Sequence, residues 1–167
     1  MRKFLVPLGI LGVFLGLVRL LWPAGAPPFS EFSSKEGKFA ILMPGTPEKK
    51  TKFVNGVTQI TYGTSFNNCV YSVSYADMPT FDAFNLNNSA KNVVKAFAGK
   101  VLTDTPCSFA YSKGRQFEAR TTKPKGFLSC RITIINLRYY MILAVGEDAR
   151  LSNANVEKFL HSFKRLQ

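Results

Sequence analysis

The amino-acid sequence predicts an α+β domain, in which an antiparallel β-sheet of about six strands carries two packed α-helices after an N-terminal transmembrane or signal segment. Short extended runs with period-two alternation end at Gly, Pro and Asn turns, as strands do. Two further stretches have the 3.6-residue period of an amphipathic helix. Because short turns join most of the extended runs, we expect antiparallel pairing.

Residues 1–22 have the pattern of an export signal. Two basic residues precede Phe4 to Trp22, a stretch that is apolar except for Arg19. If Arg19 extends its charged group outward, these 19 residues would nearly span, as a helix, a hydrocarbon core of about 30 Å. A small-residue cleavage pattern follows, but Pro27 fits a protease site poorly because proline lacks an N–H and has a fixed φ. We therefore expect a signal anchor, and a signal peptide cleaved near Ala26 is the alternative.

Two further regions follow this segment. Residues 23–34 are rich in Pro, Gly and Ser and are expected to form a linker. Residues 35–167 are then expected to form a single α+β globular domain, which is long enough for one hydrophobic core.

The first part of the domain is expected to hold three strands. Residues 38–47 form an apolar run closed by a Pro-Gly turn. Asn55 and Gly56 predict a hairpin turn. Alternating residues at 57–64 and 70–75 predict the next two strands.

A change of period then predicts a helix at 89–102, capped by Asn88 or Ser89. The apolar face of this helix holds Ala90, Val93, Val94, Phe97 and Val101. Four more strands are expected at 107–111, 115–122, 127–136 and 137–145, with a turn at 112–114.

The C-terminal tail predicts the second helix, capped by Ser152 or Asn153. Its apolar face holds Val156, Phe159, Leu160 and Phe163. Lys164 and Arg165 are expected in its last turn, where cations suit the helix dipole.

The chain is strongly basic, with 22 Lys and Arg against 10 Asp and Glu and a formal net charge of +12. This surplus favours anionic partners, such as lipid head groups or the acidic face of a membrane protein complex. Two short clusters are candidate contacts: Lys49, Lys50 and Lys52, and Lys123 and Lys125. Because the basic residues are scattered and the chain carries an export signal, no nucleic-acid partner is expected.

The three cysteines leave two interpretations open. Cys107 and Cys130 lie on separate predicted strands and are the candidate disulfide pair of an exported protein, which would leave Cys69 as a free thiol. In the other interpretation, all three are buried thiols that pack as small apolar side chains.

The sequence shows no pattern of catalytic or metal-binding residues. His161 is the single histidine and lies off the apolar face of the tail helix, so we expect it on the surface and predict neither a metal site nor a cofactor. Asp77 and Asp82 lie in one loop, where ordinary turn hydrogen bonding explains a carboxylate better than acid–base chemistry does.

Several stretches taken together resemble a known group of proteins. "FSSKEGKFAILMPGTP", "YSVSYADMP", "SKGRQFEAR", "RYYMILAVGE" and "VEKFLHSF" are similar to motifs of uncharacterised exported bacterial proteins, frequent in cyanobacteria and planctomycetes. The order of elements is also similar to the PsbP-like fold, an antiparallel sheet flanked by helices. The resemblance covers about residues 30–166 and lies in turn and core residues, so it implies a fold more than an activity.

These observations lead to one expected function and two alternatives. We expect a non-enzymatic, membrane-anchored accessory domain that assists a membrane protein complex, on the periplasmic or lumenal side of a bacterial inner or thylakoid membrane. Cleavage near Ala26 would instead release the domain into the periplasm. The alternatives are a binding module for a small apolar ligand or lipid in a Phe-rich space, and an enzyme of unrecognised class.

Overall fold

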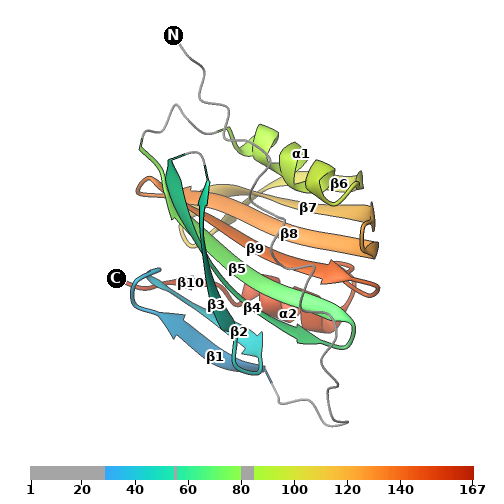
Figure 1. Ribbon diagram of the computed structural model, residues 1–167, viewed down its shortest axis with the longest axis horizontal. Helices are drawn as coiled ribbons and strands as arrows, with labels where there is room; N and C mark the ends of the chain where they lie inside the picture. The colour runs from blue at the N-terminus through green and yellow to red at the C-terminus, as the bar shows by residue number, and fades with distance from the viewer. Residues whose placement is uncertain (1–28, 55, 80–84) are drawn as a thin grey trace.

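The computed structural model describes residues 29–167 except 55 and 80–84, so the expected anchor, Asn55 and Asp82 lie outside the described residues. Ten strands and two α-helices are described (Figure 1). The strands are β1 (Phe29–Ser34), β2 (Phe39–Pro44), β3 (Glu48–Val54), β4 (Val57–Phe66), β5 (Cys69–Asp77), β6 (Lys100–Phe109), β7 (Ser112–Thr122), β8 (Lys125–Ile135), β9 (Arg138–Gly146) and β10 (Lys164–Arg165). The helices are α1 (Leu86–Ala96) and α2 (Ala154–His161).

A seven-stranded antiparallel sheet forms the centre of the molecule, with the strand order β3-β4-β5-β9-β8-β7-β6. The chain builds this sheet from both edges. β3, β4 and β5 run inward, α1 then leads to β6 at the opposite edge, and β7, β8 and β9 return until β9 pairs with β5 (Figure 1). The expected α+β class is therefore confirmed, but the ten described strands form two sheets instead of one sheet of about six.

The second sheet has three strands in the order β1-β2-β10. β1 consists of residues that the sequence assigns to the linker. These residues form a strand because Phe29 packs edge-on against Tyr71, with ring centroids 5.6 Å apart, and Phe32 packs on Tyr62 at 4.8 Å. Partial burial of these two aromatic rings stabilises a segment whose serines and single charge resemble those of a linker.

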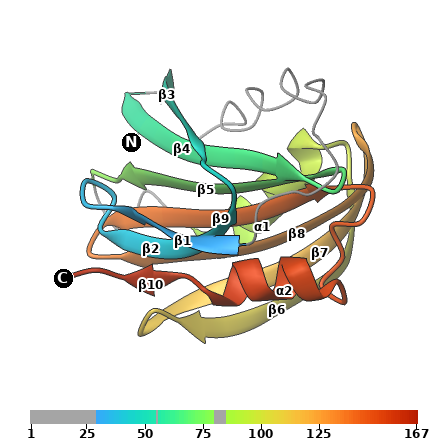
Figure 2. The ribbon, with the colours of Figure 1, turned by 90° about the horizontal axis from the view of Figure 1, so that it is seen from below.

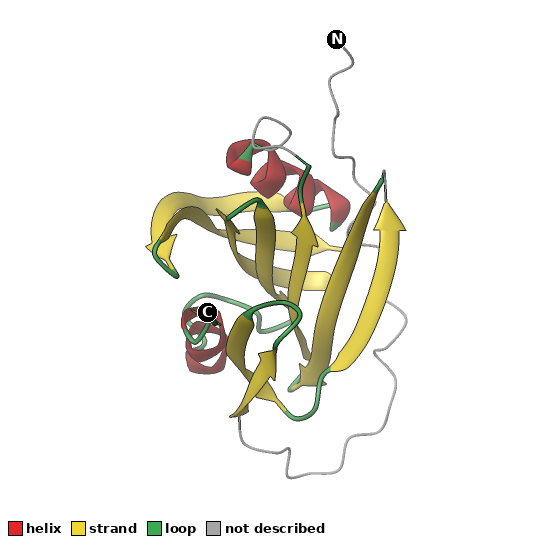
Figure 3. Ribbon diagram, turned by 90° about the vertical axis from the view of Figure 1, so that its left-hand side faces the viewer, coloured by secondary structure: helices red, strands yellow, loops and turns green. Residues whose placement is uncertain are grey.

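The two faces of the large sheet carry different covers (Figure 3). α1 contacts β6, β7 and β8 on one face, and we call the apolar cluster beneath it the α1 core. The small sheet and α2 cover the other face over β4, β5, β8 and β9. We call the cluster between the two sheets the two-sheet core. Because both faces are covered, nearly every residue of the central strands β5 and β9 is buried.

α1 starts and ends earlier than the sequence predicts. Its N-cap is Asn85, whose side chain accepts hydrogen bonds from two backbone N–H groups of the first turn. The helix ends at Ala96, before a residue with φ of +47° at Ala98 and then Gly99, an arrangement that terminates helices. Val101 therefore lies in β6 and is 41% exposed, whereas the other predicted apolar residues, Ala90, Val93, Val94 and Phe97, are buried as expected.

The tail helix is also shorter than expected. α2 begins after Asn153, one of the two predicted caps, and ends at His161. Phe163 then turns into the two-sheet core and stacks on Phe39, with centroids 5.8 Å apart. This contact places the following residues beside β2. Lys164 and Arg165 therefore pair with β2 as the strand β10 and do not lie in the last turn of a helix.

The turn expected at 112–114 lies two residues earlier in the chain. Ala110 and Tyr111, both with positive φ, connect β6 to β7. Gly114 lies inside β7, where an added Cβ would come within 2.4 Å of the Ile132 carbonyl oxygen. This glycine therefore serves close packing and not turn formation.

Candidate docking surfaces

The strands of both sheets run between two ends of the molecule. The proximal end is the end at which β1 begins, and it also holds the β4–β5 turn, the β7–β8 turn and the connection from β9 to α2. The distal end holds the β1–β2, β6–β7 and β8–β9 turns and the C-terminal residues. Figure 2 shows the β1–β2 turn and the C-terminus together on the left.

One arginine fixes the β1–β2 turn onto the distal end of the large sheet. Arg138, at the start of β9, pairs with Asp77 at the end of β5 through both Nε and Nη2, the latter 2.7 Å from Oδ2. Its Nη1 donates to the Glu36 carbonyl oxygen at 2.7 Å, and its guanidinium lies 5.0 Å from the Tyr75 ring centroid. Three separate parts of the chain therefore meet at one guanidinium.

Two further contacts hold the same turn. Tyr140 donates its hydroxyl hydrogen to the Gly37 carbonyl oxygen at 2.8 Å, and a Cβ at Gly37 would come within 2.8 Å of the Tyr75 ring. Burial, together with the charge of the Glu36 carboxylate, raises the pKa of Tyr75. The glycine of the "SKEGKF" motif thus allows the turn to lie directly on the aromatic rings of the sheet.

The carboxylate of Asp77 has a structural role in this arrangement. The hydrogen bond from Arg138 lowers the pKa of Asp77 and raises that of Arg138, against the opposing effect of desolvation. A carboxylate held ionised by a bidentate arginine is a poor proton donor. Its sequence neighbour Asp82 lies outside the described residues.

Strand alternation divides the first lysine cluster between two faces. Lys49 lies on the side of the small sheet and pairs with Glu36 at 2.7 Å, which lowers the pKa of Glu36. Lys50 and Lys52 lie on the side of α1, because successive side chains of a strand point in opposite directions. Phe53 shares the face of Lys49 and is 72% exposed. The structure therefore does not bring the three lysines together as one patch.

The second cluster lies at the proximal end, and the three strands β4, β5 and β9 separate it from β3. Lys123 and Lys125 are both exposed in the β7–β8 turn. Close by, the guanidinium carbon atoms of Arg120 and Arg150 lie 5.7 Å and 4.0 Å from the Phe127 ring centroid. Sequence reasoning does not identify this pair of arginines, because 30 residues separate them in the chain.

The three cysteines are free thiols in the structure. Cys107 on β6 and Cys130 on β8 are separated by β7 and belong to opposite faces of the sheet, Cys107 beside the two-sheet core and Cys130 in the α1 core. Burial raises the pKa of Cys130 and of Cys69. The geometry does not bring the candidate disulfide pair together.

Arg131 is a buried charge that the sequence does not reveal. It is 8% exposed and lies beneath α2, where its Nη1 donates to the Leu160 carbonyl oxygen at 3.2 Å. Its guanidinium carbon lies 4.4 Å from the Phe109 ring centroid. A cation at the last turn of a helix is favoured by the helix dipole, so Arg131 helps to hold α2 on the sheet.

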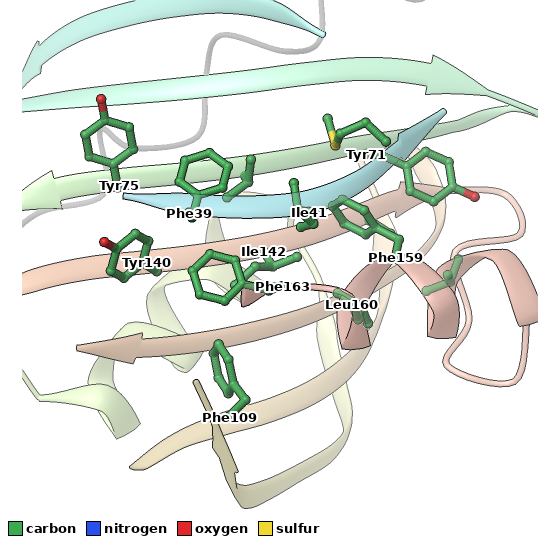
Figure 4. Packing of buried hydrophobic residues seen from close by; sticks show 14 of the residues in the cluster. Phe39, Ile41, Tyr71, Tyr75, Phe109, Tyr140, Ile142, Phe159, Leu160 and Phe163 are labelled. Carbon is green, nitrogen blue, oxygen red and sulfur yellow. The ribbon is translucent and has the colours of Figure 1, made fainter. Parts of the chain in front are cut away.

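Aromatic side chains occupy the space between the two sheets (Figure 4). Tyr71 meets Phe159 edge-on at 5.2 Å, and Phe163 contacts Tyr140 at 5.2 Å and Phe109 at 5.9 Å. These contacts make the Phe-rich region, a candidate ligand space in the sequence, a packed core that joins β5, β9, α2 and the small sheet.

No group of three or more His, Cys, Asp or Glu side chains able to hold a metal ion is present among the described residues, and His161 is exposed. Within the same part of the chain, no helix has the length and apolar content needed to span a membrane.

The arrangement of strands and helices is that of a PsbP-like α+β domain. The solution structure of cyanobacterial PsbP (CyanoP) from Synechocystis sp. PCC 6803 is similar to this chain with a TM-score of 0.58 and 12% sequence identity. The match covers 89% of this chain and 98% of the CyanoP chain. No family model and no curated protein sequence matches this chain. The PsbP-like fold expected from the order of elements in the sequence is therefore confirmed.

Proposed function

We propose that this protein is a non-enzymatic accessory domain, held on the extracytoplasmic side of a membrane by residues 1–22, where it assists a membrane protein complex. The observation that carries the proposal is the similarity to CyanoP over nearly the whole of both chains. The membrane is a bacterial inner or thylakoid membrane, and the domain lies on its periplasmic or lumenal side. Signal cleavage near Ala26 is the alternative, and it would leave the domain free.

The distal end is the surface we assign to the partner complex. Phe53 and Tyr111 are large apolar side chains at this end, with exposed fractions of 72% and 107%. Exposed aromatic residues are typical anchors of protein interfaces, and arginine is enriched beside them. The contacts of Arg138 and Tyr140 hold the β1–β2 turn rigid, so this surface loses little conformational entropy on docking.

The basic side chains of the same end give the surface its charge. Lys38, Lys113 and Arg165 are exposed there. Such charges increase the rate of association with an acidic partner more than they increase affinity, and their effect falls with added salt. The proposed partner is therefore a membrane protein complex with an acidic extracytoplasmic face.

An affinity purification of the full chain from its own membranes in mild detergent tests this function. The tag follows a long flexible linker at the C-terminus, because cleavage near Ala26 would remove an N-terminal tag and because the linker keeps the tag clear of the distal end, where the C-terminus lies (Figure 2). We expect mass spectrometry to find a stoichiometric membrane complex with the unchanged protein. The double variant Phe53→Ser/Tyr111→Ser should lose that complex, since anchor residues contribute about 2 kcal/mol or more each.

The matched control is Lys123→Ser/Lys125→Ser, which changes two exposed residues at the opposite end and should retain the complex. A membrane-fraction eluate without any partner would refute the accessory function. If only the control variant lost the complex, the interface would lie at the proximal end and not at the distal end.

A further inference from the structure

We propose that the proximal end of the domain is a docking surface for the anionic lipid head groups of the membrane to which the chain is attached. The surface, which we call the proximal basic surface, consists of Lys95, Lys100, Arg120, Lys123, Lys125 and Arg150, all exposed. This inference rests on the membrane attachment in the proposed function and adds the orientation of the domain and the chemistry of its contact.

The first argument is where the chain enters the domain. β1 begins at Phe29, which lies opposite Pro44 at the proximal end. Only the six residues 23–28 separate Phe29 from Trp22, the last residue of the apolar run. Even fully extended, such a segment spans only about 20 Å. An apolar segment in the membrane therefore keeps the proximal end near the bilayer surface and directs the distal end away from it.

The second argument is the contiguity of the surface. The backbone N–H of Lys123 donates to the Phe97 carbonyl oxygen at 3.4 Å, and Thr122 donates its hydroxyl hydrogen to the Ala98 carbonyl oxygen at 3.0 Å. These bonds join the β7–β8 turn to the end of α1, next to Lys95. In the sheet, Lys100 lies directly opposite Arg120. Four segments of the chain therefore bring their cations to one end of the fold.

The third argument is the pair of arginines on one ring. Arg120 and Arg150 both lie against Phe127, and the ion pairs found among the described residues include neither of them. Two guanidinium groups near one ring repel each other unless an anion lies between or beside them. A guanidinium that stacks on an aromatic face still has N–H donors at its edge, which match the geometry of a phosphate.

The carboxylates of the region compensate only half of this charge. Glu118 accepts a hydrogen bond from the backbone N–H of Leu151 at 2.7 Å, and Asp148 lies 3.4 Å from the side-chain amide nitrogen of Asn153. Glu147 is exposed beside the β7–β8 turn. Six cations against these three carboxylates give the surface a positive charge. Juxtamembrane cations of this kind are attracted to anionic lipids.

The test is amide hydrogen exchange of the full chain, reconstituted either in phosphatidylcholine vesicles or in vesicles with equal parts of phosphatidylcholine and phosphatidylglycerol. We expect slower exchange in the anionic vesicles at 97–100, 122–126 and 147–152, and the same exchange in both vesicles at the distal turns. High salt should remove the difference, because it screens the attraction between exposed cations and lipid.

Charge reversal makes the test specific. Arg120→Glu/Arg150→Glu should abolish the slower exchange, and Lys123→Glu/Lys125→Glu, which changes no stacked residue, should reduce it without affecting the fold. Lys113→Glu/Arg165→Glu makes the same change of charge at the distal end and should behave as the unchanged protein does.

Equal exchange in neutral and anionic vesicles, or protection that appears only when a membrane protein complex is added, would overturn the lipid surface. Vesicle flotation separates this failure from failure of the proposed function. A chain that floats with the vesicles but shows no protection refutes only the lipid surface. A chain that does not float refutes membrane attachment itself.

Discussion

Arg138 and Asp77 make the stability of the distal end depend on pH. Arg138 lowers the pKa of Asp77 in the folded state, whereas the unfolded chain has an ordinary carboxyl pKa of about 4. A carboxyl group with a depressed folded pKa stabilises the fold above its unfolded pKa, and this stabilisation is lost as the pH falls through the folded value. The pair therefore contributes at neutral pH and not in strong acid.

Replacing this carboxylate tests the dependence. Because the Asp77 side chain is 68% exposed, Asp77→Asn should reduce the free energy of unfolding by only about 0.5–1 kcal/mol at pH 7. Urea denaturation at pH 7 and in strong acid should show the variant and the unchanged protein converging at the lower pH, once the pH lies below the depressed folded pKa and the carboxyl is protonated in both states. An equal loss at both pH values would show that the residue acts through packing and not through its charge.

The cysteines give a second prediction for single residues. Cys69 and Cys130 are buried with raised pKa values, and Cys107 is partly exposed. A thiolate-selective reagent should label one thiol of the folded protein quickly and three thiols in denaturant. Cys107→Ser should remove the fast reaction. One thiol in denaturant would instead indicate the disulfide between Cys107 and Cys130 that the sequence leaves open.

Single residues also show what sequence reasoning finds and misses. The apolar positions Val156, Phe159 and Leu160 follow from helical spacing and are buried. Arg131 is buried although arginine is normally a surface residue, because a helix carbonyl and an aromatic ring compensate its charge. Arg120 and Arg150 meet only after the sheet is assembled, so no local pattern reveals them.

Among the elements, the β6–β7 hairpin departs most clearly from turn preferences. Its two connecting residues, Ala110 and Tyr111, have φ values of +49° and +62°. Two-residue hairpin turns of this conformation favour Asn-Gly, because a Cβ at positive φ costs about 1–2 kcal/mol per residue. The chain therefore retains a strained turn that places a fully exposed Tyr111 at the distal end.

Ala110→Asn/Tyr111→Gly should relieve this strain and raise the free energy of unfolding by about 1–2 kcal/mol, measured by chemical denaturation. The single variant Ala110→Asn keeps Tyr111 and should show a smaller gain. If the double variant were no more stable than the unchanged protein, the contacts of Ala110 with the two-sheet core would have to offset the strain.

Element boundaries were predictable where a local pattern decided them. Alternation located β4 and β5 within a few residues, and a long extended run of largely apolar residues located β9. β1, β3 and β10 escaped prediction because their sequences are polar, short or rich in lysine, and pairing with a neighbour is what makes them strands. α1 begins earlier in the chain than predicted because its N-cap is Asn85, which lies three residues before the predicted cap Asn88.

For the molecule as a whole, we expect the two-sheet core, which holds most of the buried aromatic rings, to be the main source of stability. Phe39 is fully buried and contacts rings from β1, β4, β5, β9 and the tail. Phe39→Ala should cost about 3–5 kcal/mol, a large part of the stability of a domain of this size. Thermal denaturation should show a large fall in Tm.

Phe53→Ala is the matched control, because the same side chain is removed from an exposed position. Its Tm should stay close to that of the unchanged protein. Similar effects of the two substitutions would mean that the rings between the sheets do not form the main core.

The overall class was predictable from the alternation of short strands and two amphipathic helices, and the motif resemblance added the PsbP-like fold that the similarity to CyanoP supports. The division into two sheets was not predictable. It depends on Phe29, Phe32 and Phe163 crossing from the small sheet to the large one, and no local pattern specifies the partner of an aromatic side chain.

The pairing of β5 with β9 also governs how the chain folds. Its partners are 61 residues apart at Asp77 and Arg138 and 77 apart at Cys69 and Gly146. Every other neighbouring pair in the large sheet is a local hairpin, which forms in about 1–10 μs, whereas a distant pair must await loop closure. We therefore expect the two meanders to form early and to join last. Until they join, each exposes an unpaired, apolar strand edge, and in this interval the folding chain is most open to aggregation.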